Sequence, residues 1–220
     1  MDGNKAVVWD LDGVLVDSGE AHKASWVAMA REWDIPYDPE KDFPATFGRH
    51  NTDIINLLWG VTDANVIQQM ADCKEGYFRH SATNLRPAPG AVDLVDALKA
   101  AGWKQAIGSS APLKNITVLL QAMGLTEKMD AIASGDDVSK GKPDPEVFLV
   151  AFRKLSIEPA HGVVIEDAPA GVRAGKSAGA ACIGIANSQD ETVLKEAGAD
   201  LVVHDLTALS VDTLDSLIGK

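Results

Sequence analysis

Six short, uninterrupted hydrophobic runs are the feature of this sequence that most constrains its fold. Each is rich in Val, Ile or Ala and lacks the polar alternation of a half-exposed strand. Such runs are typical of strands that are covered on both faces, and helical patterns separate most of them. We therefore predict an α/β fold with a parallel sheet. The runs begin near Lys5, Trp103, Asp130, Gly162, Ala181 and Ala199.

The helical patterns between the runs have recognisable ends. One follows Pro89 and Gly90 and stops at Gly102, and the next begins at Pro112 and stops at Gly124. Proline in a first turn and glycine just beyond a last turn are common helix boundaries. Two further helices are predicted in "DPEVFLVAFRKL" and "PAGVRAGKSAG".

The alternation fails between the first and second runs. From about Ser18 to about Leu85 the pattern is helical only, and "NLRPAPG" then has the prolines and glycine of a linker. A single crossover helix does not need a segment of this length. We predict an inserted all-helical cap at residues 18–85, and an α/β core made of residues 1–17 and 86–220.

Composition excludes several classes of function. The net charge of -12 argues against a nucleic-acid partner, which requires a dense cationic face. No apolar run is long enough to cross a membrane, and the N-terminus has no secretory pattern. Cys73 and Cys182 have no metal-type spacing. We expect a cytoplasmic protein with neither a membrane nor a nucleic-acid partner.

Two acids follow the first hydrophobic run. Asp10 and Asp12 are two positions apart, so on an extended chain their side chains point the same way, and Gly13 lets the chain turn. In parallel sheets ligands bind beyond the carboxyl ends of the strands. The second run ends in Ser109, and Lys142 follows the third.

The fourth run ends in Glu166 and Asp167, which adds two more acids at the same expected edge. Crowded carboxylates repel unless a cation holds them, and oxygen ligands without Cys or His favour Mg²⁺. Protein-bound Mg²⁺ commonly acts on phosphates, for which Lys142 and the Ser109 hydroxyl are suitable partners. An aspartate can attack phosphorus while a second one transfers the proton.

Four stretches carry a family resemblance: "DLDGVLVDS", "IGSS", "GKPDP" and "VIEDAPAGVRAGKSAG". In this order and at these strand ends, they resemble the four motifs of the haloacid dehalogenase superfamily. The similarity is greatest to its sugar-phosphate phosphatase and β-phosphoglucomutase branch, and it covers nearly the whole chain. It implies a Rossmann-like parallel-sheet core with a helical cap, and relatives with such caps are often monomers.

The resemblance implies a role for each acid. Asp10 is the nucleophile and Asp12 the general acid and base. Mg²⁺ is held by the Asp10 side chain, the Asp12 backbone carbonyl and Asp167. Glu166 lies beside them, either as a direct ligand or as a residue that orients the waters of the metal.

The remaining expected site residues bind the substrate. Ser109 and Lys142 hold the transferring phosphoryl group, although Ser109 could instead cap the following helix. In the cap, His22 of "GEAH" faces the substrate, and Arg49 of "GRHN" contacts an anionic group. The alternative for His22 is an exposed position on the helix.

Three functions compete. We favour a phosphatase that acts on a small phosphorylated metabolite, such as a sugar phosphate. A β-phosphoglucomutase-like mutase is the alternative, and a non-catalytic α/β binding module is disfavoured because every motif residue is present. The mutases carry a cap lysine one turn before a tyrosine. Here Lys74 precedes Tyr77 with Cys73 in the expected slot, an offset of about 100° that predicts a lysine turned away from substrate.

Overall fold

The computed structural model describes residues 5–46, 49–187 and 190–218. The chain divides into two compact units. One combines Met1–Asp17 with Arg86–Lys220, and the other is Ser18–Leu85. Among the described residues, no helix is long and apolar enough to cross a membrane.

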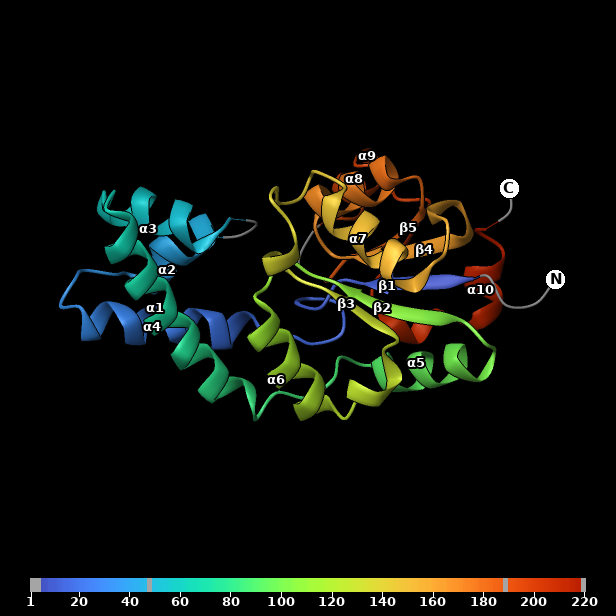
Figure 1. The fold of residues 1–220 in the computed structure, drawn as a ribbon, viewed down its shortest axis with the longest axis horizontal. Helices are drawn as coiled ribbons and strands as arrows, with labels where there is room; N and C mark the ends of the chain where they lie inside the picture. Colours follow the sequence, from blue (N-terminus) through green and yellow to red (C-terminus); the bar gives the residue numbers. More distant parts are fainter. Residues whose placement is uncertain (1–4, 47–48, 188–189, 219–220) are drawn as a thin grey trace. The chain divides into compact units, whose positions relative to one another are not determined.

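The larger unit is built on a six-stranded sheet in which every neighbouring pair is parallel (Figure 1). The strand order is β3-β2-β1-β4-β5-β6, so β1 lies in the middle between β2 and β4. All six predicted strands and the α/β fold class are confirmed. The strands are β1 Ala6–Trp9, β2 Lys104–Gly108, β3 Ala131–Ala133, β4 Gly162–Glu166, β5 Ala181–Ile185 and β6 Leu201–Val203.

Helices cover both faces of this sheet, with α7, α8 and α9 on one face and α5, α6 and α10 on the other (Figure 1). The predicted boundary glycine Gly124 takes the left-handed conformation directly after α6, and Gly179, the last residue of the stretch "PAGVRAGKSAG", does so directly after α8. The helices are α5 Ala91–Ala100, α6 Leu113–Met123, α7 Glu146–Leu155, α8 Pro169–Ala178, α9 Glu191–Glu196 and α10 Val211–Asp215. Short 3-10 helices span Thr126–Lys128, Gly135–Asp137, Pro159–His161 and Leu206–Ala208.

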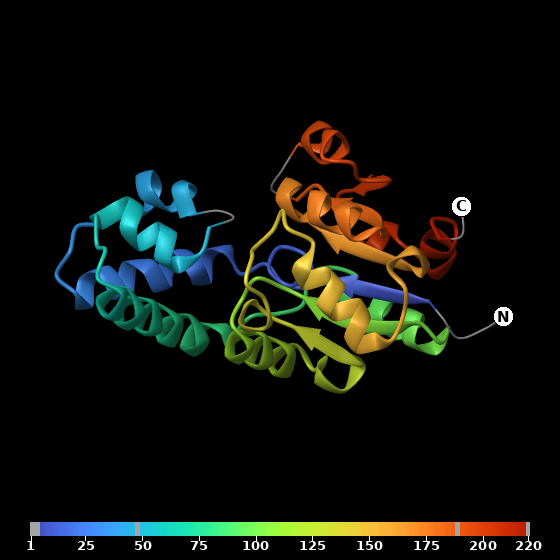
Figure 2. The same ribbon diagram turned by 45° about the horizontal axis from the view of Figure 1, so that its top comes forward.

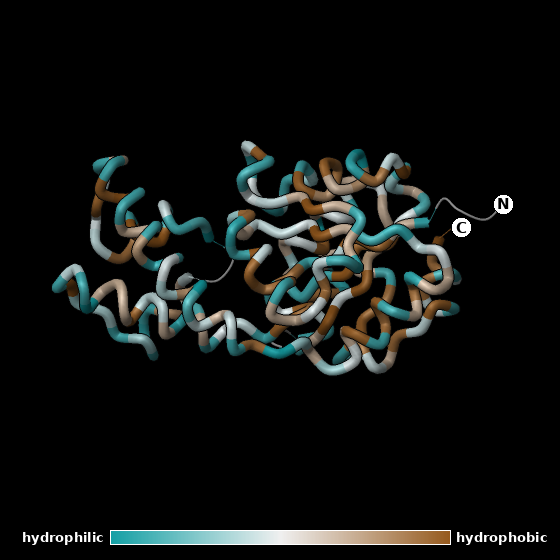
Figure 3. The backbone as a smooth tube through the Cα atoms, turned by 60° about the horizontal axis from the view of Figure 1, so that its bottom comes forward, coloured by the Kyte–Doolittle hydropathy of each residue, from teal (hydrophilic) through white to brown (hydrophobic). Residues whose placement is uncertain are grey.

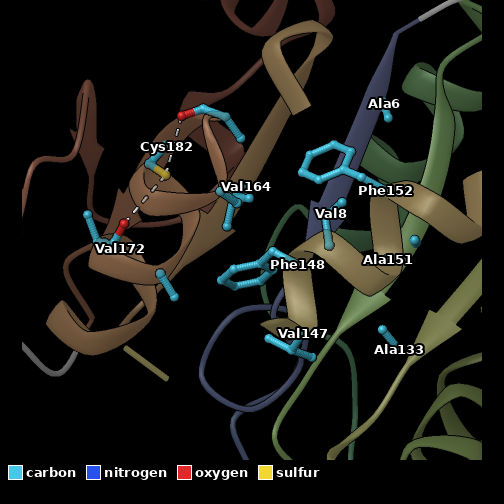
Figure 4. Close-up of a cluster of buried hydrophobic side chains, with 14 of the residues drawn as sticks. Ala6, Val8, Ala133, Val147, Phe148, Ala151, Phe152, Val164, Val172 and Cys182 are labelled. Atoms are coloured by element: carbon cyan, nitrogen blue, oxygen red, sulfur yellow. Dashed lines mark hydrogen bonds between the residues drawn. The ribbon is translucent and has the colours of Figure 1, made fainter. Parts of the chain in front are cut away.

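One hydrophobic core cluster of this unit lies between the sheet and α7 and α8 (Figure 4). Phe148 and Phe152 on α7 are buried against strand residues such as Val8 and Val164. Gly108 on β2 makes room for Phe148, since a Cβ there would lie 2.8 Å from the ring. Packing of this kind fixes α7 firmly on the sheet.

The helical unit has its own core. Buried residues from α1, α3 and α4 meet in one cluster that includes Trp26, Met29, Ile55 and Met70. Helices α1 and α4 lie side by side (Figure 2). Hydrophobic and hydrophilic residues alternate along the helices of both units (Figure 3). The elements are α1 Gly19–Glu32, α2 Pro39–Asp42, a 3-10 turn Phe43–Thr46, α3 Asn51–Trp59 and α4 Ala64–Ala82.

Candidate active site

The acids expected at the site follow two adjacent strands. Asp10 comes directly after β1, and its backbone N–H donates to the carbonyl of Ile165 on β4 at 2.9 Å. Since Trp9 lies opposite both Ile107 and Ile165, Asp10 is level with the last residues of β2 and β4. Glu166 is that last residue of β4, and Asp167 follows it.

Asp10, Glu166 and Asp167 form a cluster of carboxylates. Their ligand oxygens lie within 4.8 Å of one another, and Asp10 and Glu166 are buried. The donor set consists of hard oxygens without Cys or His, which is the set that Mg²⁺ prefers. These residues therefore fit a magnesium ion.

Lys142 joins two of these carboxylates. Its Nζ lies 2.6 Å from Asp10 Oδ1 and 2.6 Å from Glu166 Oε1, and its side chain is 9% exposed. The ammonium group also lies 4.7 Å from the centre of the Phe148 ring, a cation–π distance. The lysine is thus fixed at a point where it neutralises part of the acidic charge.

Burial and crowding change the acidities of these groups. Burial raises the pKa of Asp10 to about 7; the Lys142 ammonium opposes this rise, while the charges of Glu166 and Asp12 add to it. Burial, with the charges of Glu166 and Asp10, raises the pKa of Asp167 well above its usual range. Burial disfavours the charged form of Lys142, but Asp10 and Glu166 more than offset this and raise its pKa. The pKa values of Asp10 and Asp167 thus remain raised although the Lys142 ammonium lowers both.

Two glycines make room for the carboxylates. Gly13 has φ +87°, and a Cβ there would lie 2.0 Å from Asp167 Oδ2. A Cβ on Gly171 would lie 1.7 Å from Glu166 Oε1. The other oxygen of Glu166 accepts a 2.8 Å hydrogen bond from the Ala168 N–H. Only glycine lets the backbone approach Glu166 and Asp167 this closely.

Asp12 lies in the turn that follows Asp10. It pairs with Val16 in an isolated bridge, and Gly13 N donates to the Val16 carbonyl at 2.8 Å. The side chain of Asn187 donates to the Gly13 carbonyl. The charge of Asp12 contributes to the raised pKa values of Asp10 and Asp167, so its carboxylate belongs to the same acidic region.

Ser109 follows β2 and is buried, with its N–H bonded to the Ala133 carbonyl at 3.1 Å. Its Oγ accepts a 3.0 Å bond from the Ala111 N–H. Helix α6 begins later, at Leu113. The Leu113 N–H donates to the Asp136 carboxylate and not to Ser109. The alternative that Ser109 caps this helix is therefore wrong, and its hydroxyl stabilises the turn that follows β2.

The two expected cap residues lie in the helical unit. His22 on α1 stacks on Phe78 with 4.0 Å between ring centroids, so it is not simply an exposed surface residue. Arg49 is exposed and precedes α3, with its N–H bonded to the Thr46 carbonyl at 3.2 Å. Gly48 of the "GRHN" stretch lies outside the described residues.

Lys74 is buried within the helical unit. Its Nζ lies 2.9 Å from His22 Nδ1 and 2.8 Å from Glu75 Oε1, and the residue is 2% exposed. Asn51 donates to the same Glu75 oxygen at 2.7 Å. The ammonium group of Lys74 therefore lies next to the ring of His22, the histidine expected to face substrate. The packing of α4 on α1 brings the two side chains together, and the expectation that Lys74 is turned away from substrate stays a prediction.

Sequence reasoning also missed two neighbours of the site. Phe148 supports Lys142, and Gly171 makes room for Glu166. In the sequence pattern Phe148 is indistinguishable from an ordinary core residue of an amphipathic helix. Gly171 in "PAGVRAG" suggests only a residue that weakens a helix. A glycine inside a predicted helix is nevertheless the one sequence signal that another group approaches the backbone closely.

A family model for haloacid dehalogenase-like hydrolases matches residues 4–179, and the chain belongs to this family. The chain is 30% identical to validoxylamine A 7′-phosphate phosphatase of Streptomyces hygroscopicus subsp. limoneus, over 92% of this chain and 94% of that protein. It is 32% identical to β-phosphoglucomutase of Bacillus subtilis, over 96% of this chain and 93% of that protein. The resemblance to phosphatases and mutases is confirmed.

The fold is similar to that of a solved relative. The crystal structure of a HAD hydrolase, family IA, variant 3, from Entamoeba histolytica matches with a TM-score of 0.88 and 28% identity. The match covers 98% of this chain and 100% of that one. The Rossmann-like parallel core is thereby confirmed.

Proposed function

We propose that this protein is a Mg²⁺-dependent phosphatase that hydrolyses a small phosphorylated metabolite, most suitably a sugar phosphate. The observation that carries the proposal is the cluster of Asp10, Glu166 and Asp167 with Lys142 bonded between two of its members. The named activities of the related phosphatase and mutase, both of which handle phosphate esters, support the same chemistry.

The oxygen cluster gives Mg²⁺ a suitable set of ligands. The proposed ligands are Asp10, Asp167 and the backbone carbonyl of Asp12, with Glu166 beside them. When bound, the ion would offset the carboxylate charges and stabilise the negative charge of the phosphoryl oxygens. Both oxygens of Glu166 already accept hydrogen bonds, from Lys142 and Ala168, which favours an indirect role for that residue.

In the first step Asp10 attacks the phosphorus atom. A bond forms between an Asp10 carboxylate oxygen and phosphorus, and the bond from phosphorus to the ester oxygen breaks. Lys142 and Ser109 hold the transferring phosphoryl oxygens. Asp12 donates a proton to the departing oxygen, so the dephosphorylated alcohol leaves neutral and Asp12 is left ionised.

In the second step water cleaves the aspartyl-phosphate. Asp12, now ionised, removes a proton from the water as its oxygen bonds to phosphorus. The bond from phosphorus to Asp10 breaks and returns the free carboxylate. The products are inorganic phosphate and a protonated Asp12, and the enzyme is ready for another cycle.

A screen of phosphorylated metabolites with Mg²⁺ tests this function. We expect release of inorganic phosphate from one or more sugar phosphates, and loss of that release in excess chelator. Readdition of Mg²⁺ is the control and restores activity. Full activity in chelator would contradict the dependence on Mg²⁺. No hydrolysis of any phosphate ester would rule the phosphatase out and favour a binding module.

A mutase is the second candidate, and one observation favours it. Lys74 lies against His22 in the helical unit, so the chain does have a cap lysine beside the histidine expected to contact substrate. Incubation with β-glucose 1-phosphate and a trace of the 1,6-bisphosphate separates the two functions. A phosphatase releases inorganic phosphate, whereas a mutase yields glucose 6-phosphate without net release.

A further inference from the structure

The loop that carries Lys142 is organised around one carboxylate. Glu146 Oε2 accepts three hydrogen bonds: from Ser139 N at 2.9 Å, Ser139 Oγ at 3.0 Å and Lys140 N at 2.9 Å. The donors precede Lys142, whereas Glu146 follows it as the first residue of α7. The side chain of Glu146 therefore closes the loop on either side of the lysine.

Further contacts hold the same loop from within. Asp144 Oδ1 accepts from Glu146 N at 3.1 Å, and Asp144 N donates to the Gly141 carbonyl at 3.1 Å. The Lys140 and Ser139 N–H groups lower the pKa of Glu146, which keeps it ionised and a strong acceptor at neutral pH.

Helix α7 connects this loop to the rigid core. Val147 and Phe148, the two residues after Glu146, are buried. Phe148 also contacts the Lys142 ammonium group from the core side. Since the lysine bonds two carboxylates at 2.6 Å each, small displacements of its loop would weaken both contacts.

We propose that Glu146 is a positioning residue that sets the place of Lys142 by binding the preceding loop to the first turn of α7. Glu146 touches no reacting group and acts through the lysine. The inference rests on the proposed function in one respect, namely that Lys142 binds the transferring phosphoryl group.

Three variants and one control test the proposal. Glu146→Ala removes all three bonds, while Glu146→Gln keeps an oxygen acceptor at the same length. Ser139→Ala removes one donor from an exposed position and is a milder version of the same change. The control is Asp205→Ala, because Asp205 Oδ1 likewise accepts from the backbone N–H and hydroxyl of Thr207 in a different loop.

The affinity for tungstate, a tetrahedral oxyanion, is measured with Mg²⁺ present in each variant, with and without Lys142→Ala. We expect Glu146→Ala to weaken binding about tenfold, Ser139→Ala less, and Glu146→Gln and Asp205→Ala hardly at all. In the Lys142→Ala background, Glu146→Ala should cause no further loss. Trypsin should also cleave after the exposed Lys140 faster in Glu146→Ala than in the wild type.

The outcomes are distinct. An unchanged tungstate affinity in Glu146→Ala, or an equal loss with and without Lys142, overturns the inference and leaves the proposed function intact. If the wild-type protein neither binds tungstate nor hydrolyses phosphate esters, the proposed function fails and this inference fails with it. A non-additive loss that Glu146→Gln avoids, together with faster cleavage at Lys140, supports it.

Discussion

At the scale of single residues, Asp10 is notable because its ionised form is poorly stabilised by the protein alone. Its pKa is raised from 3.8 to about 7, chiefly by burial. The folded state therefore binds this proton more tightly than the unfolded state. The resulting stabilisation is fully present below about pH 4 and is lost as the pH rises to about 7, on the order of a few kcal/mol.

Thermal unfolding in chelator between pH 4 and pH 7 measures this effect. We expect the difference in stability between Asp10→Asn and the wild type to grow with pH, in favour of the variant. Acids whose pKa is lowered, such as Asp137, change stability with pH in the opposite direction. Their contribution is the same in both proteins, so it cancels in the difference. Mg²⁺ should reduce the difference by stabilising the ionised wild type. Parallel curves in chelator would contradict the account.

Gly171 gives a second residue-scale prediction. A Cβ at this position would lie 1.7 Å from the Glu166 carboxylate, which is buried and bonded to Lys142. We expect Gly171→Ala to lower both the melting temperature and Mg²⁺ affinity, measured by calorimetry. Gly76→Ala is the control: Gly76 is an exposed residue of α4 with open space around it, so this change should stabilise by about 0.5–1 kcal/mol. Equal effects of the two substitutions would show that Gly171 has no special role.

At the scale of elements, the strands could be predicted and the shortest helices could not. Each buried strand is a continuous apolar run, a pattern that survives any arrangement of its neighbours. Helices α2, α9 and α10 were not predicted. They are too short for a helical period to be visible, and caps such as Asp190 at the start of α9 determine them.

Helix α7 has a packing role and a site role that can be separated. Phe148 and Phe152 are both buried in the same cluster, but the Phe148 ring also lies against Lys142. We expect Phe148→Leu and Phe152→Leu to reduce the free energy of unfolding similarly, by about 0.5–3 kcal/mol. Only Phe148→Leu should also weaken inhibition by inorganic phosphate, measured at a temperature where both variants are folded. Similar inhibition in both variants would restrict Phe148 to packing.

At the scale of the whole molecule, the positions of the acids at the sheet edge could be predicted because strand order in sequence and parallel topology fix which ends meet. The contact between Lys74 and His22 could not be predicted from the sequence. His22 and Lys74 are far apart in sequence, and their contact depends on how α4 is rotated against α1. The spacing between Lys74 and Tyr77 along α4 does not specify how α4 is rotated against α1.

The helical unit gives a prediction about specificity. If Arg49 binds the sugar phosphate, Arg49→Ala should reduce kcat/KM for such a substrate about tenfold or more, and change hydrolysis of p-nitrophenyl phosphate much less. Arg153, in the last turn of α7, is a suitable control position for removal of one arginine. Equal losses for both substrates would place Arg49 outside the substrate site.

The central claim is that Asp10 attacks phosphorus and Asp12 moves the proton, and one experiment tests it directly. Asp12→Asn and Asp10→Asn are each mixed with p-nitrophenyl phosphate and Mg²⁺. Nitrophenolate is a good leaving group and departs with little help from an acid. Hydrolysis of the aspartyl-phosphate still needs a general base, and loss of that base should slow this step by about 10²–10⁴.

Asp12→Asn should therefore give a burst of nitrophenolate and gain the mass of one phosphoryl group, while Asp10→Asn should give neither. The wild type provides the turnover reference, and thermal melting with and without Mg²⁺ confirms that both variants fold and bind the ion. The account is contradicted if Asp10→Asn becomes phosphorylated, or if folded, Mg²⁺-binding Asp12→Asn gives neither a burst nor a mass increase.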